Sequence, residues 1–232
     1  TGASLVLDTS GHAHISYQDY ENRDLKYATN VSGAWVTTTV DSYGWIGFDS
    51  SIAVDASGHV HISYTDDTNY DLKYATNASG AWITTTVTSG YIFYESIATD
   101  TSGHAHICYE SNGLWYATNA SGTWITTMVD SELNAGDWCS IAVDTSGHAH
   151  ISYHDFTNAH LKYATNVSGS WVTATIDSEE DVGWSTSLAL GASGSIHISY
   201  GSGGDNISIK YATNVSGAWG ITTVNNNEGL FG

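Results

Sequence analysis

Lysine and arginine are scarce in this 232-residue chain. Five basic residues stand against 24 acidic ones, which gives a formal net charge of −19 at pH 7. Such a surface repels phosphate backbones and anionic lipid headgroups. We therefore expect neither a nucleic-acid partner nor a membrane partner.

Other features are also missing. No uninterrupted apolar run approaches the length of a membrane span, and no basic, apolar signal segment opens the chain. We expect Thr1 to be a mature start or an arbitrary boundary. The two cysteines, Cys108 and Cys139, are too few for a disulfide framework and say little about the redox compartment.

A repeated sequence dominates what is present. Its tryptophans, spaced by 47, 42, 47 and 48 residues, are Trp35, Trp82, Trp124, Trp171 and Trp219. A second marker, SGHxHISY, recurs in the first four copies with one substitution and fades to SGSIHISY at residues 193–200. Five copies account for the whole chain. We predict a single domain, 1–232, with repeats at approximately 1–45, 46–91, 92–134, 135–181 and 182–232.

Each copy has the pattern of β-strands. In the second copy, residues 51–55 (SIAVD) form a short apolar run, and residues 59–66 alternate between apolar and polar positions. This alternation predicts strands, and no helical stripe competes with it. Four short antiparallel strands, repeated around an axis, describe a β-propeller. The predicted fold class is therefore all-β, a five-bladed β-propeller with four antiparallel strands per blade.

The strands can also be ordered within a blade. SIAVD suits the innermost strand, and the threonine-rich WITTTV segment suits the wet outer edge. The spacing from each motif tryptophan to the next histidine marker is nearly constant, also across the two termini. We expect the ring to close without a blade shared between the ends.

The segment ATNVSGAW at residues 28–35 and its four copies resemble the Asp-box, or bacterial neuraminidase repeat, S/T-x-D-x-G-x-T-W. Asparagine replaces the aspartate in every copy, and the glycine comes one position late. The resemblance implies a bacterial β-propeller in which the box forms the turn between the third and fourth strands, far from the active site. In such a turn, asparagine bonds backbone N–H groups, glycine adopts a positive φ and tryptophan packs on the turn.

Sialidases of that architecture grip the substrate carboxylate with three arginines, whereas this chain has one, Arg23. Lysine cannot reproduce the bidentate guanidinium. We therefore predict that the protein is not a sialidase. We expect no enzymatic activity and assign no catalytic residue, because a propeller fold alone implies no other activity.

Histidines two residues apart lie on one face of a strand and offer two imidazoles to a metal. The pairs are His12/His14, His59/His61, His104/His106 and His148/His150. We identify no recurring third ligand, so we expect no metal and no cofactor, and we interpret the pairs as packing and hydrogen bonding between blades. The aspartates that precede the Ser-Gly turns are interpreted as turn formers.

The copies differ mainly in the loops of one face, which are aromatic and acidic. Aromatic rings stack on the C–H face of a sugar, while carboxylates and amides accept its hydroxyl hydrogens. We predict a carbohydrate site on this variable-loop face. The leading residues are Trp45, Phe48, Tyr94, Trp138 and Trp184, with Asp19, Asp66 and Asp155 as polar partners. Alternatively, these aromatic side chains fill the gaps between blades.

Three functional classes stay open. The first is a non-catalytic, monomeric, lectin-like module of an extracellular or cell-surface bacterial protein, which binds carbohydrate or another protein surface. The second is a five-bladed glycosidase, which needs two carboxylates about 5–9.5 Å apart at the centre of the funnel. Its candidate acids are Asp19, Asp66, Glu110, Asp155 and Asp205. The third is a structural or protein-interaction propeller.

Overall fold

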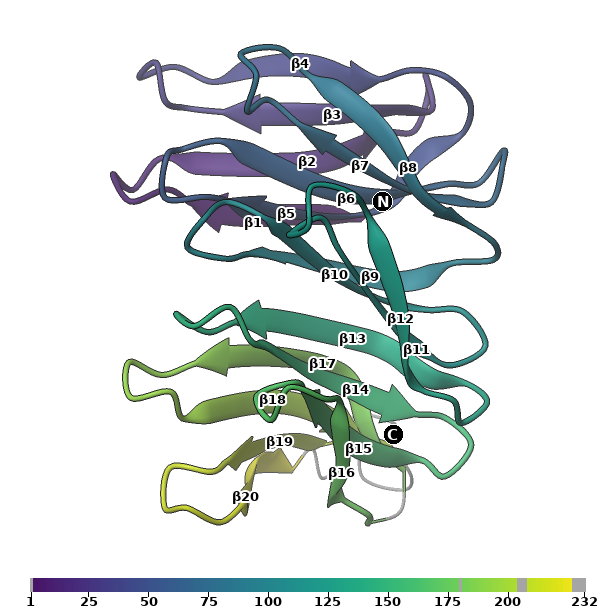
Figure 1. The fold of residues 1–232 in the computed structure, drawn as a ribbon, viewed down its shortest axis with the longest axis vertical. Helices are drawn as coiled ribbons and strands as arrows, with labels where there is room; N and C mark the ends of the chain where they lie inside the picture. Colours follow the sequence, from purple (N-terminus) through teal and green to yellow (C-terminus); the bar gives the residue numbers. More distant parts are fainter. Residues whose placement is uncertain (1, 180, 204–207, 227–232) are drawn as a thin grey trace.

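The protein is a five-bladed β-propeller. The computed structural model describes residues 2–179, 181–203 and 208–226. Within these ranges there is no helix, and hence none long and apolar enough to cross a membrane. Twenty strands form five four-stranded antiparallel sheets, each in sequence order, so that each repeat forms one blade (Figure 1). No sheet combines strands from both ends of the chain, in agreement with the sequence prediction.

The strands have the following bounds. The first blade contains β1 (Ala3–Leu7), β2 (Ala13–Asp19), β3 (Asp24–Thr29) and β4 (Val36–Asp41), and the second β5 (Ile46–Val54), β6 (Val60–Asp66), β7 (Asp71–Thr76) and β8 (Ile83–Ser89). The third contains β9 (Phe93–Thr99), β10 (Ala105–Glu110), β11 (Leu114–Thr118) and β12 (Ile125–Asp130). The fourth contains β13 (Ala135–Val143), β14 (Ala149–Asp155), β15 (His160–Thr165) and β16 (Val172–Asp177), and the fifth β17 (Val182–Leu190), β18 (Ile196–Ser202), β19 (Ser208–Thr213) and β20 (Gly220–Asn226).

The predicted order of strands within a blade is confirmed. SIAVD lies in β5, at one edge of its sheet, and the threonine-rich segment forms β8 at the other edge. The side chains of β8 are mostly exposed, whereas every residue of β6 is buried. Polar β-branched residues thus occupy the wet edge strand, where they keep strand propensity.

The hydrophobic core lies between blades. Four clusters of buried apolar side chains occur, and each combines residues from two adjacent blades. At the boundary of the first two blades, for example, Leu25 packs with Ile52 and Tyr64. A serine of each of the first four inner strands fixes the next blade: the Oγ of Ser51, for example, accepts a hydrogen bond from the backbone N–H of Ile97 at 3.2 Å. Burial of this apolar surface holds neighbouring blades together.

The repeated asparagine turns have the predicted role. Asn77 Oδ1 accepts a hydrogen bond from the backbone N–H of Val60 at 2.8 Å, which ties the turn to the start of the second strand, and all five repeats make this bond. Gly80 has a φ of +85°, which glycine adopts at no steric cost. The motif tryptophan packs differently from the expectation, because Trp82 contacts Tyr27 of the preceding blade edge-on, with ring centroids 5.2 Å apart.

The histidine pairs are structural, but they act within a blade and with a carboxylate. Asp55 Oδ2 lies 2.9 Å from His59 Nδ1 and 3.5 Å from His61 Nε2. The other ring nitrogen of His61 bonds the hydroxyl of Tyr74 at 2.6 Å. The expectation of bonds between blades was therefore wrong, and the aspartate before the turn, which the sequence prediction treated separately, joins both imidazoles. We refer to the side of the molecule that carries these histidine pairs and the Ser-Gly turns as the turn face.

The boundary between the last and first blades differs from the other four. Leu5 is 61% exposed, whereas Ile52, its counterpart in the second blade, is 6% exposed. Trp35 is 57% exposed, and within the described residues it has no tyrosine partner of the kind that Trp82 has. Figure 1 places the β1–β4 sheet and the β19–β20 hairpin at opposite ends of the longest axis. Among the described residues, the last and first blades do not pack together as the other neighbouring blades do, and the apolar side chains at this boundary remain exposed.

Candidate functional site

The innermost strands surround one cavity on the axis. It has a volume of about 410 Å³, and each blade contributes the same two positions, which are Gly2 and Ala3, Asp49 and Ser50, Tyr94 and Glu95, Trp138 and Cys139, and Ser185 and Thr186. Tyr94 and Trp138 have positive φ angles of 54° and 49°, which is unusual for large side chains and typical of functional segments. The axial cavity is therefore chemically different on every side.

Glu95 is the anomaly in this cavity. In the second and fifth blades the residue at this position has a hydrogen-bond partner: Ser50 bonds Ser16 at 2.9 Å, and Thr186 bonds Ser152 at 2.8 Å. Glu95 is 8% exposed, and both its carboxyl oxygens lack a hydrogen-bond partner among the described residues. Burial raises its pKa to about 8, and the negative charge of Asp49 adds to that rise. The side chain is thus largely protonated at neutral pH.

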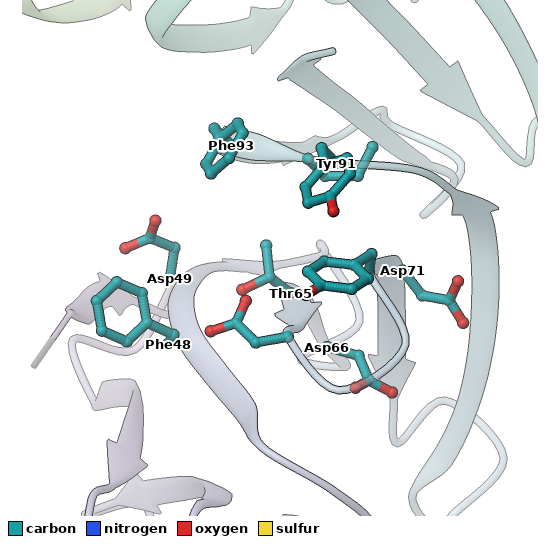
Figure 2. Close-up of a pocket in the computed structure, with 10 residues that line it drawn as sticks. Phe48, Asp49, Thr65, Asp66, Asp71, Tyr91 and Phe93 are labelled. Carbon is teal, nitrogen blue, oxygen red and sulfur yellow. The ribbon is translucent and has the colours of Figure 1, made fainter.

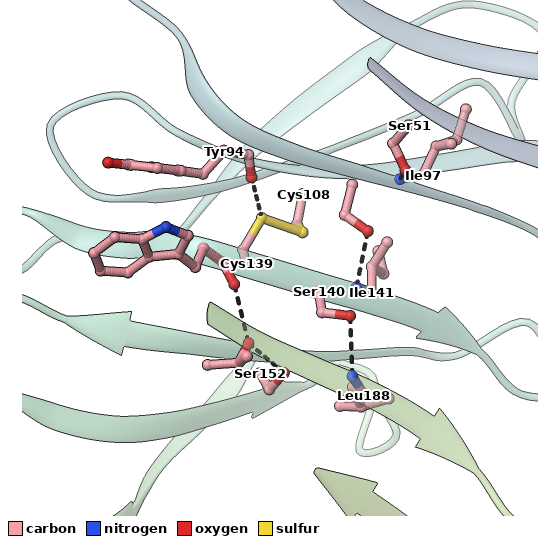
Figure 3. Close-up of a disulfide and its surroundings, with 12 residues drawn as sticks. Ser51, Tyr94, Ile97, Cys108, Cys139, Ser140, Ile141, Ser152 and Leu188 are labelled. Carbon is pink, nitrogen blue, oxygen red and sulfur yellow. Dashed lines mark hydrogen bonds between the residues drawn. A yellow bond between two sulfur atoms is a disulfide. The ribbon is translucent and has the colours of Figure 1, made fainter. Parts of the chain in front are cut away.

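The corresponding position between the third and fourth blades holds a disulfide. Cys108 on β10 and Cys139 on β13 are joined, and they close a loop across a sequence separation of 31 residues (Figure 3). The bond covalently links two blades. The cysteine count gave no indication of this role, because the pairing depends on how adjacent blades face each other.

Three of the clefts formed by the described residues open on the variable-loop face, each at a boundary between adjacent blades. The first, of about 340 Å³, lies between the first and second blades, and the third, of about 280 Å³, lies between the third and fourth. The second, which we name cleft 2/3, also has about 280 Å³. It is lined by Phe48, Asp49, Thr65, Asp66, Asp67, Tyr70, Asp71, Tyr91, Ile92 and Phe93 (Figure 2).

Exposed aromatic rings form the walls of cleft 2/3. Figure 2 shows Phe48 beside Asp49 on one side, with Tyr91 and Phe93 along another. Phe48, Tyr70, Tyr91 and Phe93 are all exposed. Tyr70 and Tyr91 lie with ring centroids 4.5 Å apart. Rings with one open face provide the platform on which the apolar side of a sugar stacks.

Carboxylates provide the polar part of cleft 2/3. Burial raises the pKa of Asp49, and burial together with the charges of Asp49 and Asp66 raises the pKa of Asp67. Asp66 is already engaged, since it accepts hydrogen bonds from the backbone of Thr68 and from the backbone and side chain of Asn69. Asp71 accepts a hydrogen bond from the hydroxyl of Thr86 at 3.5 Å, so Asp49 and Asp67 are the carboxylates that a ligand can use.

The five predicted aromatic residues lie at three different places. Phe48 lines cleft 2/3, and Trp45 lines the first cleft, where the guanidinium of Arg23 lies 4.6 Å from the centre of its ring. Tyr94, Trp138 and Trp184 pack in a row, with successive ring centroids 5.1 and 5.0 Å apart. These last three are half-buried, in a cluster with His154, as the alternative of aromatic packing between blades anticipates.

The predicted polar partners stabilise turns. Asp19 accepts hydrogen bonds from Asn22, and Asp155 accepts them from Asn158, in the same way as Asp66 bonds Asn69. Glu110, a candidate glycosidase acid, lines the third cleft, and burial raises its pKa. Asp205 lies outside the described residues. The structure does not bring the predicted residues together in one site, and their part in ligand binding stays a prediction.

Sequence reasoning missed most of cleft 2/3. Tyr91 and Phe93 belong to the variable loops but were not among the leading residues, and neither were Asp49, Asp67 and Glu95. A comparison of the repeats offers one signal, because Glu95 is the only carboxylate in a column that otherwise contains Ala3, Ser50, Cys139 and Thr186. Among the described residues, no group of three or more histidine, cysteine, aspartate or glutamate side chains is arranged to hold a metal ion.

Solved structures show what this chain resembles in fold. No protein-family model and no curated protein sequence matches it. The SapL1 lectin, solved with α-methyl fucoside, is 14% identical with a TM-score of 0.69, over 100% of this chain and 83% of that chain. A mutant of the Aleuria aurantia lectin, solved with Fucα1-6GlcNAc, is 14% identical with a TM-score of 0.67, over 97% and 79%. A mutant of the NanB sialidase from Streptococcus pneumoniae is 11% identical with a TM-score of 0.63, over 96% and 60%.

Proposed function

We propose that the protein is a carbohydrate-binding, lectin-like module whose main site is cleft 2/3. The observation that carries the proposal is the combination in one cleft of exposed rings, such as Phe48 and Phe93, with the carboxylates Asp49 and Asp67. The rings stack on the C–H face of a sugar, and the carboxylates accept hydrogen bonds from its hydroxyls. The similarity in fold to two fucose-complexed lectins supports the same function.

We further propose that the protein works outside the cell, in a bacterial secreted or surface protein, as a non-enzymatic module. The Cys108–Cys139 disulfide supports an oxidising compartment, since such bonds persist mainly in secreted proteins. The single arginine argues against the carboxylate-binding chemistry of sialidases. Carbohydrate is the partner that the cleft favours, with another protein surface as the alternative.

The test is a glycan screen, followed by titration calorimetry with the best ligand. Phe93→Ala should weaken binding by about 1–3 kcal/mol, the loss typical of a central aromatic contact, with little change in stability. Tyr43→Ala is the matched control, because Tyr43 is exposed on the same face but lines none of the three clefts. Equal losses in both variants, or no glycan ligand at all, would refute the assignment of the site or of the function.

A glycosidase is the second candidate function, and Glu95 favours it. The axial cavity holds Glu95, a carboxyl group that is protonated at neutral pH, together with Asp49, and an acid paired with a second carboxylate is what glycoside hydrolysis requires. The test is a screen of aryl glycosides with the protein and its Glu95→Gln variant. Turnover that the variant abolishes would establish an enzyme, and the absence of turnover with every substrate would leave the lectin-like module.

A further inference from the structure

The described residues that line cleft 2/3 carry negative charge and no positive charge. Four of its lining residues are aspartates, and none is a lysine, arginine or histidine. Lys73, on the strand that begins at the cleft, instead bonds Asp41 of the preceding blade. The four aromatic side chains, Phe48, Tyr70, Tyr91 and Phe93, bring the negative faces of their rings to the same space.

Two buried polar groups at this boundary also lack donors or partners. Thr65, which lines the cleft, is 5% exposed, and its hydroxyl has no hydrogen-bond partner among the described residues. Glu95 lies behind the cleft in the axial cavity, to which Asp49 also belongs, and its carboxyl group is equally unpartnered there. Buried polar groups are nearly always hydrogen-bonded in proteins, so unpaired groups beside a cleft indicate a ligand that supplies the missing contacts.

The pKa shifts of these carboxyl groups agree with a cationic ligand. Burial raises the pKa of Asp49, of Asp67 and of Glu95, and the mutual repulsion of the carboxylates adds to the rise for Asp67 and Glu95. Tyr70, Tyr91, Asp66 and Asp71 are the other titratable groups that face this space. A bound cation favours the ionised carboxylates and so releases protons from the site.

We propose that the ligand of cleft 2/3 is a sugar with a free amino group, recognised as its ammonium form. This proposal rests on the lectin-like function given above. The ammonium group lies between Asp49 and Asp67, where it donates hydrogen bonds to their carboxylates. The C–H face of the same sugar stacks on Phe48 or Phe93. An acidic sugar is repelled by the same carboxylates, and an N-acetylated sugar leaves them without a counterion.

The experiment is titration calorimetry with two glucosamine oligomers of equal length, one fully deacetylated and one fully N-acetylated. At pH 6 an amine of ordinary pKa is protonated. We expect the deacetylated oligomer to bind at least tenfold more tightly and to release protons, measured as a dependence of the binding heat on the ionisation enthalpy of the buffer. The affinity should also fall as salt is added.

Asp67→Asn should reduce the preference for the deacetylated oligomer to less than threefold. Asp67 is exposed, so this change should not disturb folding. Glu21→Gln removes the same charge at an exposed position outside cleft 2/3 and should keep the preference. If both oligomers bind equally, the amino-sugar specificity is wrong while the lectin-like function stands. If neither binds and no other glycan does, the proposed function itself fails.

Spermidine, a polyamine without a sugar ring, separates recognition of an amino sugar from simple attraction of cations. The proposal expects it to bind at least tenfold more weakly than the deacetylated oligomer, and expects Phe93→Ala to weaken only the oligomer. Equal binding of spermidine, unaffected by Phe93→Ala, would show that the cleft attracts cations without recognising a sugar.

Discussion

Two neighbouring blade boundaries of the propeller use equivalent residue positions but differ in the contacts that the residues at those positions make. Between the third and fourth blades, Tyr153 and Lys162 both donate hydrogen bonds to Asp130, at 2.7 and 2.6 Å, and the Cys108–Cys139 disulfide joins the inner strands. The boundary between the first and second blades and the boundary between the fourth and fifth blades repeat the ion pair, with Asp41–Lys73 and Asp177–Lys210.

The boundary between the second and third blades lacks each of these contacts. Thr88 stands at the position of the aspartate and Trp115 at that of the lysine, so acid and base are replaced together. Trp115 stacks on Tyr109 instead, with ring centroids 6.4 Å apart. Ser63 and Glu95 occupy the positions of the disulfide, and both are unpartnered among the described residues. This boundary therefore departs from the repeat, and it opens into cleft 2/3. Such departures are expected at functional sites.

The largest effect is expected from removing the disulfide. Cys108→Ser with Cys139→Thr should lower the free energy of unfolding by about 2–4 kcal/mol, because the bond restricts the unfolded chain across a loop of 31 residues. The new side chains reproduce the Ser152–Thr186 pair of the next boundary, so packing is retained. Urea unfolding of the oxidised protein and the variant measures the difference. An unchanged midpoint would mean that this boundary owes its stability to the core and ion pair alone.

Substitution of the motif tryptophans should distinguish the packed blade boundaries from the open boundary between the last and first blades. Trp82→Ala should cost about 2–3 kcal/mol, somewhat less than a fully buried ring, because Trp82 is half-buried against Tyr27. Trp35→Ala should cost under about 1 kcal/mol, since its side chain is mostly exposed.

A variant with two introduced cysteines tests the boundary between the last and first blades independently. Ala3 and Ser199 occupy the positions that Cys139 and Cys108 have between the third and fourth blades. With the ends apart, Ala3→Cys/Ser199→Cys should not form a bond within one chain. Quantitative formation of that bond, seen as a faster non-reduced band on gel electrophoresis, would show that the last blade closes on the first.

The comparison also explains what the sequence can and cannot predict. Contacts within a repeat follow from local order, so the alternation of residues 59–66, the Asn77 turn and the outer position of the threonine-rich strand are all predictable. Contacts between blades depend on the twist and spacing of sheets, which no single repeat specifies. The disulfide, the unpartnered Glu95 and the gathering of Phe48 with Phe93 are of this second kind.

Glu95 allows a test in the stabilising direction. Glu95→Ser should raise the free energy of unfolding at pH 8 by about 1–2 kcal/mol, because it removes a buried carboxyl group without partners and places a hydroxyl opposite Ser63. The pKa of Glu95 is raised from 4.5 to about 8 in the folded protein. Ionisation of this buried carboxyl group disfavours the folded state, so the stability that is present below about pH 4.5 is lost as the pH rises through 8. Unfolding curves at pH 5 and 8 should diverge in the parent protein and approach each other in the variant.

On the turn face, stability should depend on pH in the opposite direction, and the expected change in the free energy of unfolding is the smallest of those predicted. Burial alone would raise the pKa of Asp100, but hydrogen bonds from the ring and backbone of His104 and from the backbone of Ser102 outweigh it and lower the pKa to about 2. The stability that this carboxylate contributes is present above about pH 4 and is lost as the pH falls towards 2. Asp100→Asn keeps the shape of the turn and removes the charge, so we expect a loss of under about 1 kcal/mol at pH 5 and a shallower decline between pH 4 and 2. Combining it with Glu95→Ser should reduce both pH-dependent losses of stability independently, because Glu95 lies near the start of β9 and Asp100 follows the last residue of that strand. If Asp100→Asn instead changes the slope between pH 5 and 8, the turn face and the boundary at Glu95 are coupled, and the contrast between a constant face and a variable one does not describe how this protein is stabilised.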